Sequence, residues 1–153
     1  MRHAVEGGHH VVSDHASDVR HGVALLVRDG VDLGVEPMHF ESHVDQSQLA
    51  GACVEAPGLP KVGLMSAYFL ASEGLGQINL GLLADIAVQQ DRLRLPIIVA
   101  GDFNLNPAKI ESTDFLSRAS LTLVAPEAPT CRKPKSSNVL DYFLVSETLS
   151  EWT

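Results

Sequence analysis

The sequence predicts an α/β protein in which strands and a long helix pack together in layers. Three observations predict this class. Short apolar runs recur along the chain, residues 75–92 carry apolar side chains at helical spacing, and residues 97–100 form an apolar, β-branched run that ends at a glycine. Strand patterns on both sides of a helical pattern are typical of a layered α/β domain.

The first predicted strands follow a polar N-terminal segment, residues 1–20, for which the sequence predicts no regular structure. Residues 22–28 form an apolar run, and residues 31–35 alternate apolar with polar or small side chains. The Asp-Gly pair at residues 29–30 favours a type I′ turn, which requires positive φ. The sequence therefore predicts a hairpin here, at the start of a single domain that spans residues 21–153.

The middle of the chain changes from a strand period to a helical period. Residues 49–55 and 62–69 have strand character, and the Pro-Gly-Leu-Pro segment at residues 57–60 predicts the turn of a second hairpin. A helix that packs on a sheet is then expected over residues 75–92. Its apolar side chains are spaced three, four and four residues apart, at Leu75, Ile78, Leu82 and Ile86.

The remaining elements are predicted after Pro96, which ends the helical pattern. Residues 97–100 are apolar throughout, which indicates a central strand buried on both faces. A short helix is expected within residues 105–120, and further strands over residues 121–124 and 139–145. Ser112 or Thr113 is the expected cap of the short helix, Asp114 suits its first turn, and Pro126, Pro129 and Pro134 mark a loop.

Composition and charge restrict the function classes. The chain is 45% hydrophobic and 20% charged, which is typical of a globular protein and excludes a disordered one. No apolar run approaches the ~18 residues that a membrane span needs. Cys53 and Cys131 are too few for a disulfide framework, so an intracellular setting, nuclear or cytoplasmic, is expected. The net charge of −8 argues against tight, nonspecific binding of nucleic acid.

The most specific motif is Gly-Asp-Phe-Asn, which directly follows the predicted central strand at residues 101–104. Asp102 and Asn104 are two residues apart, so in extended backbone their side chains point to the same side. A carboxylate can take a proton from water, and an amide can orient that water or hold a phosphoryl oxygen. The alternative is that these two side chains make a turn after the strand.

Two further candidates come from one predicted strand that precedes this motif in the sequence and one that follows it. Asp141 lies in an otherwise apolar run, and a buried carboxylate needs a partner, which in a catalytic site is a histidine. The alternative is an acid at a strand end, exposed to water. Tyr68 ends the run at residues 62–69, and its alternative is a packed aromatic side chain without a role in chemistry.

In this order and spacing, the three motifs resemble the endonuclease/exonuclease/phosphatase superfamily. This superfamily includes pancreatic deoxyribonuclease, apurinic/apyrimidinic endonucleases and the endonuclease domains of non-LTR retrotransposons. The resemblance covers residues 20–147, from the strand that begins Gly22-Val23-Ala24 to the Leu-Asp-Tyr-Phe-Leu-Val-Ser strand. It implies a partial four-layer α/β/β/α sandwich with mostly antiparallel sheets, and the retrotransposon and apurinic endonuclease branch is the most similar.

The resemblance also implies a reaction and a role for each residue. Water would attack a phosphodiester in line, with Mg²⁺ or Mn²⁺ as cofactor and nucleic acid as the substrate. Asp102 would activate the water, Asn104 would position it or the phosphate, and Tyr68 would contact the scissile phosphate. Asp141 would orient a catalytic histidine. Substrate contacts are expected from three further residues, Asn106, Thr130 and Arg132, the last of which opens the basic cluster at residues 132–135.

The chain departs from the family pattern at both ends. The pattern calls for an Asn and a metal-binding Glu before residue 22, and for a Ser-Asp-His segment after the last strand. The first Asn of the chain is Asn79, and no histidine follows His43. We therefore expect an incomplete form of the domain, with weak or absent activity and doubtful metal binding, and we leave the metal ligands unknown.

Three functions remain open from the sequence. The first is a phosphodiesterase of the nuclease type, and the second is a noncatalytic remnant or interaction module with the same fold. The third is a phosphatase of small phosphoesters. The net charge of −8 leaves this function open, because a small substrate does not need an extended basic surface. The histidines at positions 9, 10, 15 and 21 match no zinc-ligand spacing, so a solvated polar tail is favoured over a metal site there.

Overall fold

The computed structural model describes residues 9–13, 23–28, 32–40, 48–133 and 136–150. Its centre is a six-stranded sheet with the strand order β3-β4-β5-β6-β10-β7. Among the described strands of this sheet, β5 and β6 pair in parallel and the other neighbours are antiparallel. The six strands are β3 (Gly34–Pro37), β4 (Leu49–Glu55), β5 (Val62–Tyr68), β6 (Ile97–Asp102), β7 (Leu121–Val124) and β10 (Asp141–Ser146).

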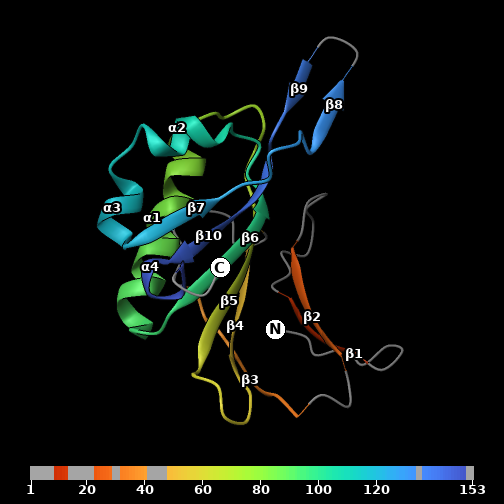
Figure 1. Ribbon diagram of the computed structural model, residues 1–153, viewed down its shortest axis with the longest axis vertical. Helices are drawn as coiled ribbons and strands as arrows, with labels where there is room; N and C mark the ends of the chain where they lie inside the picture. Colours follow the sequence, from red (N-terminus) through yellow and green to blue (C-terminus); the bar gives the residue numbers. More distant parts are fainter. Residues whose placement is uncertain (1–8, 14–22, 29–31, 41–47, 134–135, 151–153) are drawn as a thin grey trace.

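Two smaller antiparallel sheets accompany the central one. The pair β1 (His9–Ser13) and β2 (Ala24–Arg28) lies against β4 and β5. The pair β8 (Cys131–Lys133) and β9 (Ser136–Asn138) extends beyond the end of β10 as a narrow ribbon (Figure 1).

Helices cover one face of the six-stranded sheet, and the β1–β2 pair lies on the other side of it (Figure 1). The helices are α1 (Gln77–Leu93), α2 (Pro107–Glu111), α3 (Phe115–Ala119) and α4 (Glu147–Ser150). The described residues thus form a helix layer, a large sheet and a small sheet, which agrees with the predicted α/β class and its mostly antiparallel sheets. Within the described residues, no helix is long and apolar enough to cross a membrane.

The hydrophobic core lies between the helices and the six-stranded sheet. Helix α1 contributes Leu82 and Ile86, which are 1% and 0% exposed, and these side chains were predicted to face the sheet. The strands contribute alternate residues, because successive side chains of a strand point to opposite faces. The sheet residues of this core include Leu49, Cys53, Met65, Ala67, Ile97, Val99, Tyr142 and Leu144.

Several predicted elements are confirmed. The second hairpin is β4–β5, and Gly58 takes φ +77° in its turn. The predicted helix is α1, which ends when Arg94 adopts a left-handed conformation and its N–H donates to the Gln90 carbonyl. The predicted central strand is β6, which lies between β5 and β10.

The prediction of a first hairpin, around residues 29–30, is wrong. Strand β2 pairs with β1, and β3 pairs with β4, so the strands on either side of residues 29–31 belong to different sheets. An Asp-Gly pair permits a tight turn, but strand partners are decided by packing over the whole sheet. The second difference is β1, which lies in the segment 1–20 for which no regular structure was predicted.

The segment between β6 and β7 contains two short helices instead of one. Asn106 caps α2, because its Oδ1 accepts a hydrogen bond of 3.0 Å from the Ala108 N–H. Ser112 is the C-cap of α2 instead of an N-cap, whereas Thr113 accepts a 3.3 Å bond from the Phe115 N–H at the start of α3. The ribbon β8–β9 lies in the region predicted as a loop.

Candidate active site

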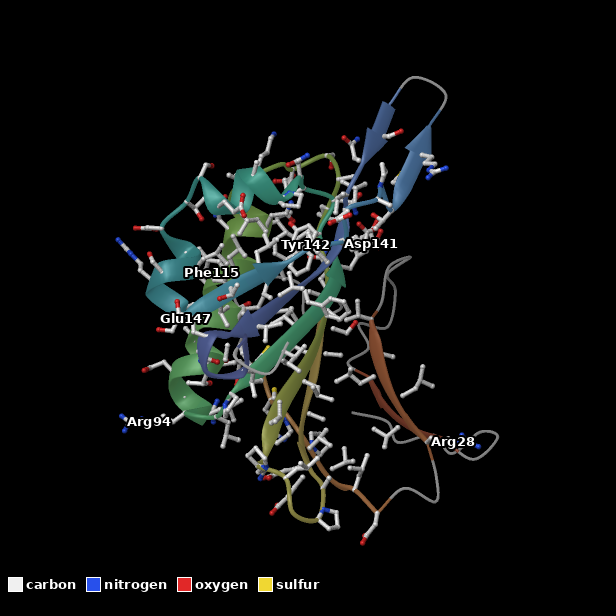
Figure 2. The ribbon with its side chains drawn as sticks, in the orientation of Figure 1. Arg28, Arg94, Phe115, Asp141, Tyr142 and Glu147 are labelled. Atoms are coloured by element: carbon white, nitrogen blue, oxygen red, sulfur yellow. The ribbon has the colours of Figure 1, made fainter. Side chains whose placement is uncertain are left out.

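Three neighbouring strands bring the predicted catalytic side chains into one row. Asp102, the last residue of β6, pairs with Asp141, the first residue of β10. On its other side Asp102 pairs with Tyr68, the last residue of β5. Directly paired residues project to the same face of a sheet, so the phenol and both carboxylates share the face opposite the helices. Figure 2 shows Asp141 at the end of the sheet where β8 and β9 begin.

The two carboxylates face each other across the closer kind of antiparallel pair. The N–H of Phe103 donates to the Leu140 carbonyl at 2.8 Å, and the Asp102 carbonyl accepts from the Phe69 N–H at 2.9 Å. Asp102 and Asp141 therefore form a pair without mutual backbone hydrogen bonds. Such pairs have Cα atoms about 4.5 Å apart and the closest side chains of a ladder. Like charges are thus held directly opposite each other.

The surroundings of Asp102 change its affinity for protons. Partial burial raises the pKa of its carboxyl above the usual value, and the Asp141 charge raises it further. The Asn104 N–H donates to Asp102 Oδ1 at 3.1 Å, which opposes the increase because it stabilises the carboxylate. A carboxyl whose pKa is raised in this way is better suited to accept a proton from water.

Asn104 adopts a left-handed backbone conformation, with φ +48°. Few residues other than glycine adopt this conformation readily, and asparagine is one of them. Its Nδ2 donates to the Phe69 carbonyl at 2.9 Å, which ties the end of β5 to the loop after β6. This contact uses one of the two N–H groups of the amide.

A second asparagine, which the sequence analysis did not single out, fixes the loop after Tyr68. Asn79 lies in the first turn of α1 and is 0% exposed. Its Oδ1 accepts from the Leu70 N–H at 2.9 Å, and its Nδ2 donates to the Leu70 and Gly74 carbonyls. A polar residue inside an amphipathic helical pattern was the signal that could have identified it.

The predicted substrate-binding residues lie close to the row in sequence, but two of them hold backbone groups. Asn106 caps α2. Thr130 Oγ1 accepts from the N–H of Leu140 at 2.9 Å and from the N–H of Asp141 at 3.1 Å. Arg132 is exposed on β8, opposite Ser137. Of the three, Arg132 is the side chain with a charge for a phosphate group.

A surface hollow of about 500 Å³ adjoins the row on the β10 side. Asp141 lies at its rim, and most of the lining is apolar. Phe143 and Val124 contribute, with 48% and 38% of their surface exposed. The lining residues are Ala100, Gly101, Val124, Ala125, Pro126, Asp141, Tyr142 and Phe143.

Oxygen ligands for a divalent cation are present in the row. Mg²⁺ is commonly held by one or two carboxylates, with water and substrate phosphate completing its shell. Asp102 and Asp141 match that minimal set, and a cation between them would relieve the repulsion of the two charges. Across the residues that the structure describes, no group of three or more His, Cys, Asp or Glu side chains gathers at one point. The histidine side chains near the N-terminus lie outside the described side chains.

Comparison with known proteins gives one family. The model of the Endonuclease/Exonuclease/phosphatase family matches residues 2–152. A comparison with curated protein sequences finds no match. Among solved structures, the endonuclease domain of TRAS1, a telomere-specific non-LTR retrotransposon, is similar with a TM-score of 0.67 at 16% identity, over 94% of this chain and 69% of that one.

Other similar structures are phosphatases. ANGEL2, a 2′,3′-cyclic phosphatase, has a TM-score of 0.60 at 16% identity, over 92% of this chain and 62% of its own. The mannosyl-6-phosphatase Bt3783 of Bacteroides thetaiotaomicron has a TM-score of 0.59 at 12% identity, over 93% of this chain and 64% of its own. The chain thus spans less than two thirds of the length of both phosphatases, and at these identities the likeness establishes the fold alone.

Proposed function

The chain belongs to the endonuclease/exonuclease/phosphatase family, and we propose that it carries the phosphodiester-cleaving residues of a metal-dependent nuclease. Hydrolysis of phosphate esters is the chemistry of the family. The observation that carries the proposal is the pairing of Asp102 with Asp141, with Tyr68 next to Asp102 on the third strand. Like charges directly opposite each other on a sheet are destabilising, so this pairing is not explained by stability.

Each residue of the row has a part in the proposed reaction. Asp102 takes a proton from the attacking water, whose oxygen forms a bond to phosphorus while the bond to the leaving oxygen breaks. Asn104 orients the water or a phosphoryl oxygen through its side-chain amide, one N–H of which donates to the Phe69 carbonyl. Tyr68 donates a hydrogen bond from its hydroxyl group to an oxygen of the scissile phosphate. Asp141 supplies the second negative charge, at the place where the family pattern has an acid that orients a histidine.

Mg²⁺ or Mn²⁺ is the proposed cofactor, and it would be held on the Asp141 side of the row, which leaves the Asp102 carboxylate to accept the proton. The ion would neutralise the negative charge that develops on the phosphoryl oxygens. Few protein oxygens are available for the ion, so we propose weak metal binding and weak activity for the residues described.

Nucleic acid is the proposed substrate. Arg132 stands exposed on the β8–β9 ribbon, which extends past the end of the sheet that carries Asp141 (Figure 1). A guanidinium beside the row can contact a phosphate that flanks the scissile one. The similarity to the TRAS1 endonuclease domain supports this choice of substrate over a small phosphoester. The division into a polar segment, residues 1–20, and a catalytic domain, residues 21–153, remains a prediction.

A nicking assay on supercoiled plasmid tests the proposal. We expect slow conversion to open circles in Mg²⁺ or Mn²⁺, none in EDTA, and none with Asp102→Ala. The matched control is Asp91→Ala, which removes an exposed carboxylate near the end of α1 and should leave the rate unchanged. Cleavage that persists in Asp102→Ala would contradict the assignment of the site.

A phosphatase of small esters is the second candidate, favoured by the net charge of −8 and by the similarity to Bt3783. Two chromogenic substrates separate the candidates. Hydrolysis of bis(p-nitrophenyl) phosphate without hydrolysis of p-nitrophenyl phosphate favours the nuclease, and the reverse favours the phosphatase. A folded chain that hydrolyses neither substrate, cleaves no plasmid and binds no Mn²⁺ would be a noncatalytic module with this fold.

A further inference from the structure

Thr130 is the one predicted substrate contact whose hydroxyl oxygen is fully engaged with the backbone of the active-site strand. Its Oγ1 accepts from the N–H of Leu140 at 2.9 Å and from the N–H of Asp141 at 3.1 Å. A hydroxyl oxygen has two lone pairs, so these two bonds use its capacity as an acceptor. The contact spans ten and eleven residues of sequence, across the whole β8–β9 ribbon.

Among the described residues, the Asp141 N–H has no strand partner on the β7 side of β10. The ladder between β10 and β7 begins at Phe143, which pairs with Val124. Leu140 and Asp141 thus lie beyond the end of β7. On the other side, Asp141 and Asp102 form a pair without mutual backbone hydrogen bonds, so the Asp141 N–H points away from β6. Thr130 takes the place of the missing strand.

The same contact closes the base of the ribbon. Thr130 directly precedes β8, and the ribbon's first pair joins Cys131 to Asn138. The side chain of Thr130 then joins the ribbon to Asp141 itself. A displacement of the ribbon, which carries Arg132, is therefore transmitted to the backbone of Asp141.

We infer that Thr130 is a positioning residue that holds Asp141 opposite Asp102 by accepting the N–H groups of Leu140 and Asp141. This inference rests on the proposed function for its catalytic consequence. Its structural basis is independent of that function: one hydroxyl accepts from the N–H of Asp141, the first residue of β10, and from the N–H of Leu140 before it.

Three variants test the inference. Thr130→Val keeps the shape and removes the acceptor, Thr130→Ser keeps the acceptor, and Thr122→Val is a matched control on β7. Amide hydrogen exchange, followed by NMR, should be about tenfold faster at Leu140 and Asp141 in Thr130→Val, with Leu144 unchanged. Thr130→Ser and Thr122→Val should exchange like the unmodified chain. Unchanged exchange at Asp141 in Thr130→Val would overturn the inference.

Hydrolysis of bis(p-nitrophenyl) phosphate gives the catalytic part of the test. Thr130→Val should lower kcat about tenfold or more with little change in KM, and Thr130→Ser should restore it. In a chain that already carries Asp141→Asn, adding Thr130→Val should lower kcat no further. The reason is that Thr130 acts on catalysis only by positioning the Asp141 carboxylate, which that chain lacks. A raised KM that persists in that background would identify Thr130 as a direct substrate contact and overturn the inference.

The outcomes also separate this inference from the proposed function. An unmodified chain that cleaves no phosphodiester contradicts the proposed function. The exchange experiment still decides whether Thr130 holds Asp141, since it needs neither substrate nor metal.

Discussion

The two faces of the six-stranded sheet differ in how completely they are covered. On the helix face, Phe69 and Phe103 are 0% exposed and Tyr142 is 2% exposed. On the opposite face, Phe143 is 48% exposed and Asp141 is open to solvent. The same strands build both faces, since alternate residues of β6 and β10 point to each. The other face is thus covered by β1–β2 at β4 and β5 but open at the end of β10, where the candidate chemistry lies.

Phe103 shows how closely the two faces are connected. It lies between Asp102 and Asn104 in sequence, yet its ring packs in the core, with its centroid 5.0 Å from that of Phe69 and 4.3 Å from that of Tyr142. The buried ring fixes the backbone from which the two polar side chains project. The comparison predicts that substitutions on the helix face lower the free energy of unfolding. Substitutions on the face that carries Asp102 and Asp141 should instead lower the catalytic activity.

The largest expected effect is that of Phe103→Ala. Loss of a fully buried aromatic side chain should lower the free energy of unfolding by about 3–5 kcal/mol. The matched substitution on the other face, Phe143→Ala, should cost less than about 1 kcal/mol, because half of that side chain is already in water. Urea denaturation followed by circular dichroism measures both. Equal losses would show that the two faces contribute alike.

A smaller effect is expected for Gly101→Ala. Gly101 lies on the helix face of β6, opposite Tyr142, and an added Cβ would overlap the Ala67 carbonyl oxygen of β5. Overpacking of this kind should cost roughly 1–3 kcal/mol, because backbone and not a flexible side chain must move. The control is Gly58→Asn, in a turn where nothing surrounds an added Cβ and where asparagine tolerates the positive φ. A Gly101→Ala variant as stable as this control would contradict the close approach of β5 and β6.

The smallest effect has the opposite sign. Asp102→Asn removes the charge that faces Asp141, so it should raise the free energy of unfolding at neutral pH by about 0.2–1 kcal/mol while abolishing cleavage. Asparagine can still accept the bond from the Asn104 N–H. Denaturation in EDTA at pH 7 measures the gain. A loss of stability would mean that Asp141 does not repel Asp102.

The pH dependence of the same pair follows from the direction of its pKa. Asp102 has a higher pKa in the folded chain than in the unfolded chain, where it is near 3.8. Between the two values the folded state binds more protons, so its contribution to stability falls as pH rises through that interval. Above that pH interval, the ionised Asp102 carboxylate destabilises the folded chain by a constant amount. Asp102→Asn should therefore exceed the unmodified chain in stability at pH 7 and lose that advantage near pH 3.

Much of the fold and the row of three residues could be predicted from the sequence, because those features rest on local patterns. Helix α1, the β4–β5 hairpin and strand β6 have clear periodicity. Asp102 and Asp141 were both identified as catalytic candidates, and the structure pairs them. Their roles in catalysis remain predictions.

The features that could not be predicted depend on distant partners. Strand β9 consists of Ser136, Ser137 and Asn138, which have low strand propensity and are held by β8. The Asp-Gly pair at residues 29–30 signalled a hairpin, but β3 packs with β4 instead. Thr130 matched a motif for substrate contact, and its bonds to residues ten and eleven positions away leave no local signal.

The unusual backbone of Asn104 bears on how its function should be probed. Alanine would impose torsional strain on the loop and would therefore confuse a misplaced chain with a missing functional group. Glycine adopts the same dihedral angles freely, so Asn104→Gly removes the amide, and with it the bond to the Phe69 carbonyl, without torsional strain. A loss of activity in Asn104→Gly would therefore report on the side chain and its contacts and not on backbone strain.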